Sequence, residues 1–183
     1  QEAGVAEPDI VKTDGDVIYT ASATGNVTVC SYRLSIVRDD EDGLELVGSV
    51  PLGELVTTPI EMLVANDVLL LIGSTNLYYE DEANEEEEED YYFWWWPSYE
   101  PAVVLLWFDV SDPSTPKLLR RQIREGSYVD ARRVDEVAYV VVARGESWGA
   151  VPRAAVPFFR DELFVEDDEI ETTFASDFEE ADA

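Results

Sequence analysis

The sequence predicts an all-β fold built from a repeated antiparallel unit. Short runs of β-branched and aromatic residues alternate with turns rich in Gly, Asp, Asn and Pro, and no window carries a convincing apolar stripe of helical period. A tight turn of acidic or amide residues precedes a strand of β-formers at three places, which makes Val17, Val68 and Val137 equivalent. Their spacings of 51 and 69 residues indicate a period of about 50 residues, with about 18 extra residues in the second unit.

A period near 50 residues filled by short strands matches one blade of a β-propeller. Leucine-rich, ankyrin and tetratricopeptide repeats are shorter and need helices, which the sequence does not predict. We therefore predict a partial β-propeller of about two and a half to three four-stranded antiparallel blades, with a long acidic and aromatic loop insertion. A β-sandwich is the alternative fold, but a sandwich needs no internal repeat.

The first predicted blade occupies residues 9–54. Its strands are expected over residues 16–22, 27–37 and 44–51. A hairpin turn at Thr24, Gly25 and Asn26 joins the first two strands, and residues 39–43 supply the turn before the third.

The second predicted blade occupies residues 60–126. Its strands are expected over 61–64, 68–73, 102–110 and 117–124, and residues 75–101 form the acidic and aromatic insertion between the second and third strands. Asp112 and Pro113 mark a turn between the last two strands, because an aspartate supplies side-chain acceptors and a proline fixes φ.

The third predicted blade begins at residue 127 and continues through 144. Strands are expected over 128–134 and 136–144, and residues 145–183 are expected to be an irregular acidic tail or the start of a further blade. The continuous apolar runs 68–72 and 137–142 predict strands that are covered on both faces.

Three segments resemble a secreted β-propeller-domain family that is distantly related to WD-repeat proteins. Residues 2–19 (EAGVAEPDIVKTDGDVIY) are similar to the family's opening signature. Residues 108–119 (FDVSDPSTPKLL) resemble its blade corner, which also occurs in LVIVD-type repeats, and residues 125–133 (EGSYVDARR) resemble its entry into the next blade. Ala6 departs from the usual acidic residue, and residues 75–101 and 145–183 match nothing in the family pattern.

The resemblance implies a propeller fold and an extracellular or cell-surface location, with no established catalytic motif. A closed propeller needs at least four blades, and 183 residues supply about two and a half to three. We therefore expect the blades to be completed by the rest of a longer chain or by other protein subunits.

Composition excludes several partners. The formal net charge is −29, with two lysines and no histidine, which leaves no surface suited to tracking nucleic-acid phosphates. The same charge repels anionic membranes, and no apolar run is long enough for direct membrane insertion.

Acidic residues cluster in two runs, residues 80–90 and 166–182. Such a run is usually a solvated loop, but hard oxygen ligands in excess also suit calcium. Halophilic adaptation is a third interpretation. Calcium is the one cofactor that the sequence suggests. Its candidate ligands are Glu85, Glu86, Glu87, Glu88, Glu89 and Asp90.

Seven aromatic rings lie within the nine residues 91–99. Exposed rings at this density promote association, so the tract is expected either to fold back over its own blade or to dock another subunit or a glycan. The candidate interface residues are Phe93, Trp94, Trp95 and Trp96.

Asn26, Val27 and Thr28 form an N-glycosylation sequon on the first predicted hairpin. This sequon is meaningful only in a secreted eukaryotic protein, and such tripeptides also arise by chance.

Catalytic motifs are missing from the sequence. There is no histidine, no GxSxG elbow, no phosphate-binding glycine loop and no HExxH, and no carboxylate pair stands out from the many acids. We expect a non-enzymatic extracellular interaction or structural module. A calcium-dependent adhesion domain is one alternative, and the propeller part of a secreted hydrolase with its catalytic residues elsewhere is another.

Overall fold

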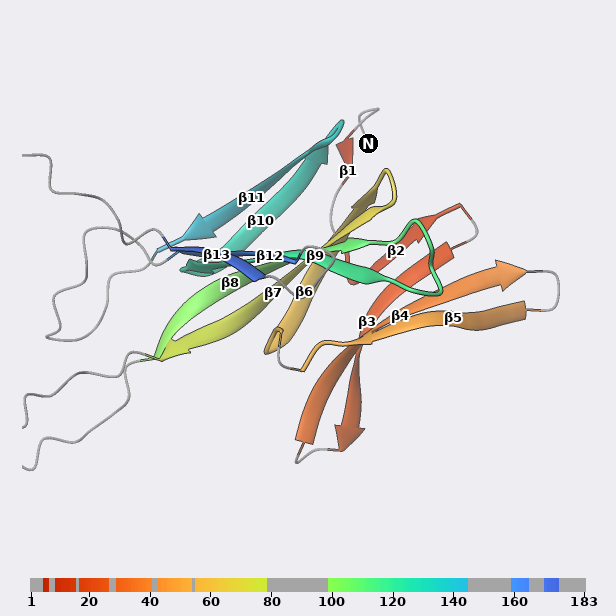
Figure 1. Ribbon diagram of the computed structural model, residues 1–183, viewed down its shortest axis with the longest axis horizontal. Coiled ribbons are helices and arrows are strands. Elements are labelled where there is room, and N and C mark those ends of the chain that lie inside the picture. The colour runs from red at the N-terminus through yellow and green to blue at the C-terminus, as the bar shows by residue number, and fades with distance from the viewer. Residues whose placement is uncertain are drawn as a thin grey trace, which may run out of the picture.

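The computed structural model describes residues 5–6, 9–15, 17–26, 29–40, 43–53, 55–78, 99–144, 159–164 and 170–174. Every regular element within these ranges is a β-strand, and the strands form three antiparallel sheets. The second sheet lies between the first and the third, so the sheets spread like a fan (Figure 1). The predicted all-β class and partial propeller are confirmed. No described segment forms a helix of the length and apolarity that a membrane crossing requires.

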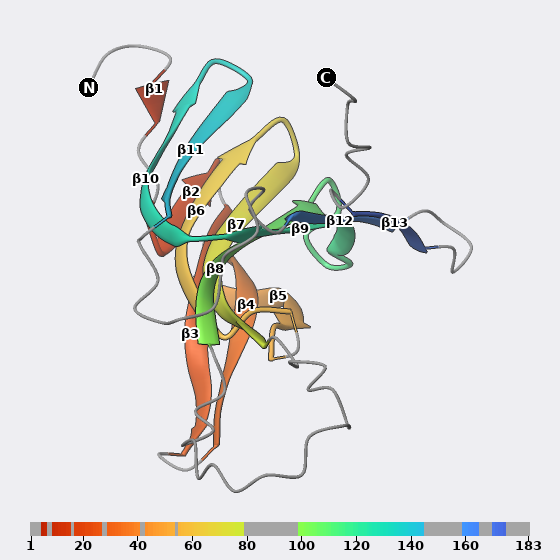
Figure 2. The same cartoon turned by 90° about the vertical axis from the view of Figure 1, so that its left-hand side faces the viewer.

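The first sheet is a four-stranded blade with the order β2-β3-β4-β5, and its long strands β3 and β4 extend below the other sheets in Figure 2. One strand was not predicted, because β2 lies in the segment that precedes the first turn. The β3–β4 ladder also extends past the turn predicted at Thr24, since the Thr24 and Ser31 hydroxyls hydrogen-bond across it at 2.9 Å. The strands are β2 (Val11–Asp14), β3 (Val17–Asn26), β4 (Val29–Asp40) and β5 (Gly43–Pro51).

The second sheet contains the four predicted strands and two more, in the order β13-β12-β9-β8-β7-β6. Residues 145–183 were expected to form an irregular tail or a further blade, but their described parts form the β12–β13 hairpin, which pairs with the outer edge of β9. The strands are β6 (Thr58–Ala65), β7 (Val68–Tyr78), β8 (Tyr99–Asp109), β9 (Lys117–Glu125), β12 (Phe159–Phe164) and β13 (Ile170–Phe174).

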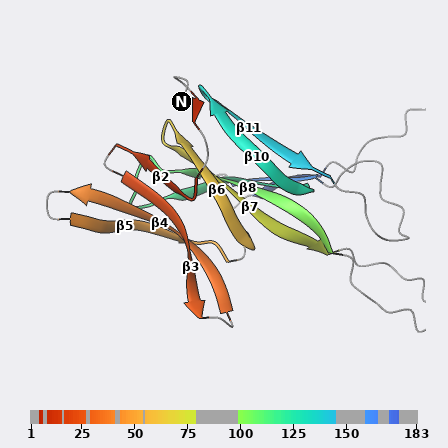
Figure 3. The same ribbon diagram turned by 180° about the vertical axis from the view of Figure 1, so that it is seen from behind.

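The third sheet consists of β10 (Ser127–Val134), β11 (Val137–Ala143) and the short β1 (Val5–Ala6), which pairs with β10. The first described strand therefore pairs with the third sheet and not with the first. Figure 3 shows β1 beside the β10–β11 hairpin, at the opposite end of the fan from β5.

The repeat predicted from the sequence is visible in the register of three hairpins. Each hairpin joins two neighbouring strands of its sheet through two residues and contains backbone in the left-handed region, at Gly15 (φ 59°), Asn66 (50°) and Asp135 (52°). Glycine, asparagine and aspartate tolerate this conformation best, which explains the polar turns seen in the sequence. The closing pairs are Asp14↔Val17, Ala65↔Val68 and Val134↔Val137, so the three valines are equivalent.

The corner between β8 and β9 packs against the first sheet. The Asp112 carboxylate accepts hydrogen bonds from the Ser114 backbone N–H at 2.9 Å and from the Thr115 hydroxyl at 3.0 Å, and these bonds lower the pKa of Asp112, with the Ser114 side chain as the largest cause. The corner places the Pro113 carbonyl oxygen directly over Gly48 of β5, where a Cβ atom would overlap it.

Two apolar cores lie on the two faces of the second sheet. Leu69 and Leu71 face the first sheet and pack with Tyr19, whereas Leu70 and Ile72 face the third sheet. Because side chains alternate along a strand, a continuous apolar run fills both cores. The prediction that residues 68–72 are covered on both faces is confirmed.

Candidate interaction surface

Strand β11 carries apolar side chains on both of its faces. Val140 and Val142 pack into the core shared with the second sheet. Val137, Tyr139 and Val141 lie on the opposite face, where 53%, 57% and 53% of their surfaces are exposed. We call this surface the leading face and define it by Val134, Val137, Tyr139 and Val141. The sequence predicted cover on both faces of this strand, and the described residues supply it on one.

The leading face is the counterpart of surfaces that are buried in the other two sheets. Counted from the equivalent valines, Tyr19, Leu70 and Tyr139 occupy one structural position. Tyr19 is 3% exposed and packs between the first and second sheets, and Leu70 is 5% exposed and packs between the second and third. The next position on the same face repeats this series with Ala21, Ile72 and Val141. A surface that makes the sheet-to-sheet contact twice is therefore left open by the described residues at its third occurrence.

Polar residues of β10 frame the leading face. Arg132 is the cross-strand partner of Tyr139, and Asp130 is that of Val141. The Arg132 guanidinium lies 3.4 Å from the Asp130 carboxylate, with both side chains largely exposed. Together with Ala131, Val134, Tyr139 and Val141 they line a shallow hollow. Since the two charges offset each other, the hollow has little net charge in a strongly acidic chain.

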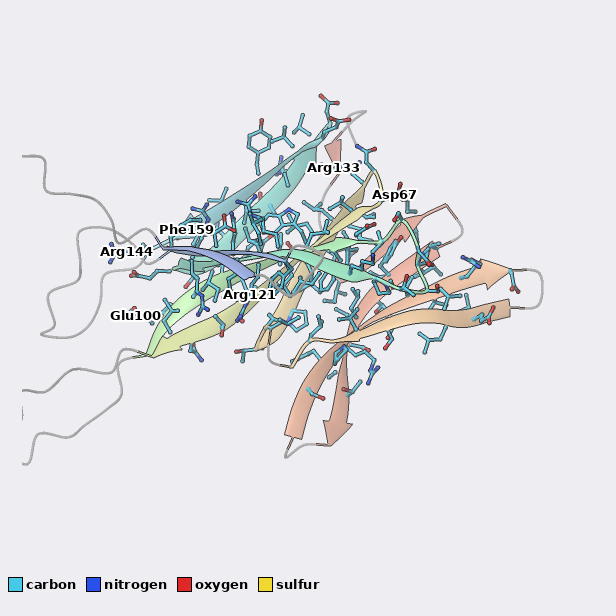
Figure 4. The ribbon with its side chains drawn as sticks, in the orientation of Figure 1. Asp67, Glu100, Arg121, Arg133, Arg144 and Phe159 are labelled. Carbon is cyan, nitrogen blue, oxygen red and sulfur yellow. The ribbon has the colours of Figure 1, made fainter. Side chains whose placement is uncertain are left out.

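The second sheet holds the third in place through polar contacts. The Tyr128 hydroxyl donates a hydrogen bond to the Glu61 carboxylate. Burial is the main cause that raises the pKa of Tyr128, and this hydrogen bond is the next largest. Arg144, labelled in Figure 4 at the end of β11, donates to the buried Glu125 carboxylate at 2.7 Å. These contacts link β10 and β11 to β6 and β9, and so support the leading face from behind.

A second apolar surface that no described residue covers lies at the other end of the fan. We call it the trailing face and define it by Val11, Ile18, Val37, Leu44 and Leu46 of the first sheet. Leu46 pairs with Val37 and Val37 with Ile18, so they share one side of the sheet. Leu44 and Leu46 are well exposed, at 69% and 61%. The fan thus ends in an apolar surface on each side.

Comparison with protein families identifies the architecture. A family model described as a beta propeller domain matches residues 1–175. The chain belongs to the β-propeller domain family. Comparison with curated proteins and with solved structures found no match.

The β-propeller assignment accounts for the repeated hairpins and the face-to-face sheets. The predicted relation to WD-repeat proteins and to LVIVD-type repeats stays a prediction, as do the extracellular location and the absence of catalysis.

Most residues that the sequence singled out lie outside the described part of this β-propeller domain. This holds for the predicted calcium ligands Glu85, Glu86, Glu87, Glu88, Glu89 and Asp90, and for the predicted interface residues Phe93, Trp94, Trp95 and Trp96. Asn26 is the last residue of β3 and pairs with Val29. In the ranges that the structure describes, no group of three or more acidic, cysteine or histidine side chains is placed to hold a metal ion.

Sequence reasoning missed a charged seam between β9 and β12. Asp161 accepts hydrogen bonds from Arg120 at 2.9 Å and from Gln122 at 3.1 Å, and the Arg120 bond is the main cause of its lowered pKa. Phe159, labelled in Figure 4, lies under the Arg124 guanidinium, 4.5 Å from ring centroid to Cζ. The signal was present as three arginines within residues 120–124, in a chain with few cations.

Proposed function

We propose that this β-propeller domain is a non-enzymatic extracellular structural and protein-interaction module that docks other protein subunits or further blades. The observation that carries the proposal is the exposure of Tyr139, because its counterparts Tyr19 and Leu70 are buried between sheets. An aromatic residue at the centre of an apolar, charge-balanced surface is typical of a residue that anchors a protein interface.

The arrangement favours a protein partner over other classes. A neutral apolar sheet face offers few hydrogen-bonding groups for a sugar, and a chain of net charge −29 repels phosphate-bearing surfaces. The predicted docking through the aromatic residues 93–96, with glycans as an alternative ligand, adds a second contact to this proposal.

Photo-crosslinking tests whether another polypeptide covers the leading face. A benzophenone amino acid replaces Tyr139 in one sample and Leu119 in a matched control, since Leu119 is exposed but belongs to neither end face. We expect crosslinks to a second polypeptide from position 139 and far fewer from position 119, in protein recovered from the secreted fraction of expressing cells.

The same experiment identifies failure. Crosslinks from position 139 that stay within residues 1–183 of the same copy, or no product, contradict the docking role. A variant with Tyr139→Arg provides a second measurement: a melting temperature close to that of the unsubstituted chain supports an open face. A loss typical of a core substitution, about 3 kcal/mol or more, shows that the chain covers Tyr139 itself.

A further inference from the structure

We propose that the occupant of the leading face is the trailing face of a second copy of this chain, packed head to tail. This inference rests on the proposed function and specifies its partner. It extends a contact that the chain already makes twice, from the first sheet to the second and from the second to the third.

The trailing face is the receiving half of that repeated contact. Counted from the equivalent valines, Ile18, Leu69 and Ala138 share one position, and Thr20, Leu71 and Val140 share the next. Leu69 and Leu71 receive the first sheet, and Val140 packs against the second. Ile18 and Thr20 hold the same place in the first sheet and stay half-exposed. Each copy therefore has one leading face and one trailing face that no described residue of the same copy covers.

Charge also favours contact at these two faces. Strand β3, which runs through the trailing face, and strand β11, which carries most of the leading face, contain no charged residue, although the chain has 41 acidic residues. The charges next to Tyr139, Arg132 and Asp130, pair with each other. Two copies can thus approach through these faces with less repulsion than through the rest of their surfaces.

The number of sheets is compatible with closure. A head-to-tail contact is heterologous, so it forms either a closed ring or an open filament. The described residues of two copies supply six sheets, and closed propellers contain about four to eight. A closed pair would cover all four end faces at once.

Sedimentation velocity with complementary variants tests the proposal. Tyr139→Arg blocks the leading face and Leu46→Arg blocks the trailing face, while Leu119→Arg is the matched control outside both. The measurements use about 1 M salt, where the Debye length falls to about 3 Å and the negative charges of the copies are screened. We expect the unsubstituted chain and the control to associate, and each single variant to bind itself more than about tenfold more weakly.

Mixing the two single variants distinguishes head-to-tail packing from the alternatives. The Leu46→Arg copy retains its Tyr139, and the Tyr139→Arg copy retains its Leu46, so we expect the equimolar mixture to recover a complex of two chains. A dimer of two leading faces predicts instead that Leu46→Arg still associates alone and that mixing recovers nothing. That result overturns the proposal.

A monomeric unsubstituted chain at high salt also overturns it. In that case, crosslinks from position 139 to a different polypeptide would leave the proposed docking function in place. Failure of the head-to-tail contact and failure of the docking function therefore have different signatures.

Discussion

At two places the chain packs so closely that only glycine, which has no Cβ atom, leaves enough room. Gly48 of β5 accepts the Pro113 carbonyl oxygen where any other residue would place its Cβ atom. Gly73 of β7 holds an equivalent role under Val56. Neither glycine has a positive φ, so the requirement is for space and not for backbone conformation. The blade corner therefore needs a small residue opposite it.

Replacing Gly48 by alanine should destabilise the chain. The added Cβ forces the corner at Pro113 to shift, and overpacking of this kind costs about 1–3 kcal/mol. Gly53→Ala is the matched control, because its Cβ would meet only the Ser31 Cβ, at an ordinary 3.7 Å. Urea unfolding of both variants measures the difference, and equal losses would show that the corner yields freely.

The acidic residues 85–90 are candidate ligands for calcium. If they bind calcium, adding calcium should raise the melting temperature through preferential binding to the native state. Replacing Glu85, Glu86, Glu87, Glu88 and Glu89 by glutamine should remove that shift. Matched ionic strength is the control, and identical melting curves with calcium and with chelator would leave a solvated acidic loop as the interpretation.

At the scale of elements, the outer edge of β9 is closed by a charge-matched strand. β9 contributes Arg120, Arg121 and Arg124, and β12 contributes Asp161 and Glu162 opposite them. Glu162 is buried and lies 3.5 Å from Arg121. An arginine-rich edge strand would otherwise leave its hydrogen-bonding groups open to other chains. The β12–β13 hairpin thus covers the edge of β9 and makes β13 the outermost described strand on that side of the second sheet.

Removing Asp161 should loosen that hairpin. The Asp161→Ala variant loses the charge-assisted bond from Arg120, and because Arg120 is 40% exposed the expected cost is only about 1 kcal/mol. Hydrogen exchange should show lost protection across β12 while β7 and β8 keep theirs. Asp130→Ala is the control, since its pair with Arg132 is longer and more exposed. Equal effects would mean that backbone pairing alone holds β12.

The contribution of Asp161 to the stability of the chain should also decrease in acid. The folded state holds the pKa of Asp161 below its ordinary value of 3.8, mainly through the hydrogen bond from Arg120. The group therefore adds stability above that ordinary value, and this contribution is lost as the pH falls through it toward the folded pKa. The difference in melting temperature between the unsubstituted chain and Asp161→Asn should shrink between pH 6 and pH 3. A difference that does not change with pH would assign the contact to packing.

At the scale of the whole molecule, the sequence predicted the features that depend on local turn residues. It did not predict the pairing of strands that lie far apart in the chain. The three polar hairpins and the corner at Asp112 follow from residues close in sequence, and they yielded the repeat and the fold class. The pairing of β1 with β10 and of β12 with β9 joins segments far apart, and no local signal reports such partners. The leading face was visible only as a run of apolar residues, because its exposure depends on which sheets are present.

The aromatic residues 93–96 are expected to contribute to association between chains. Trp94→Ala combined with Trp95→Ala should disrupt association while the blade strands stay folded, because buried interface aromatics commonly contribute more than about 2 kcal/mol each. Size-exclusion chromatography and circular dichroism on both proteins measure the two properties. Intact association together with lost folding would instead assign the aromatic tract to the chain's own core.

The strand formed by Val5 and Ala6 has a consequence for the time course of folding. Its partner, β10, is made much later during synthesis, since Val5 pairs with Val134. Contacts between such distant segments form slowly, because a long loop must close before they are gained. The first sheet and strands β6 to β9 of the second can form while Val5 and Ala6 are still unpaired, and the third sheet is complete only after β10 and β11 have been made. Val5 and Ala6 thus reach their native place only after β10, far along the chain, has been made.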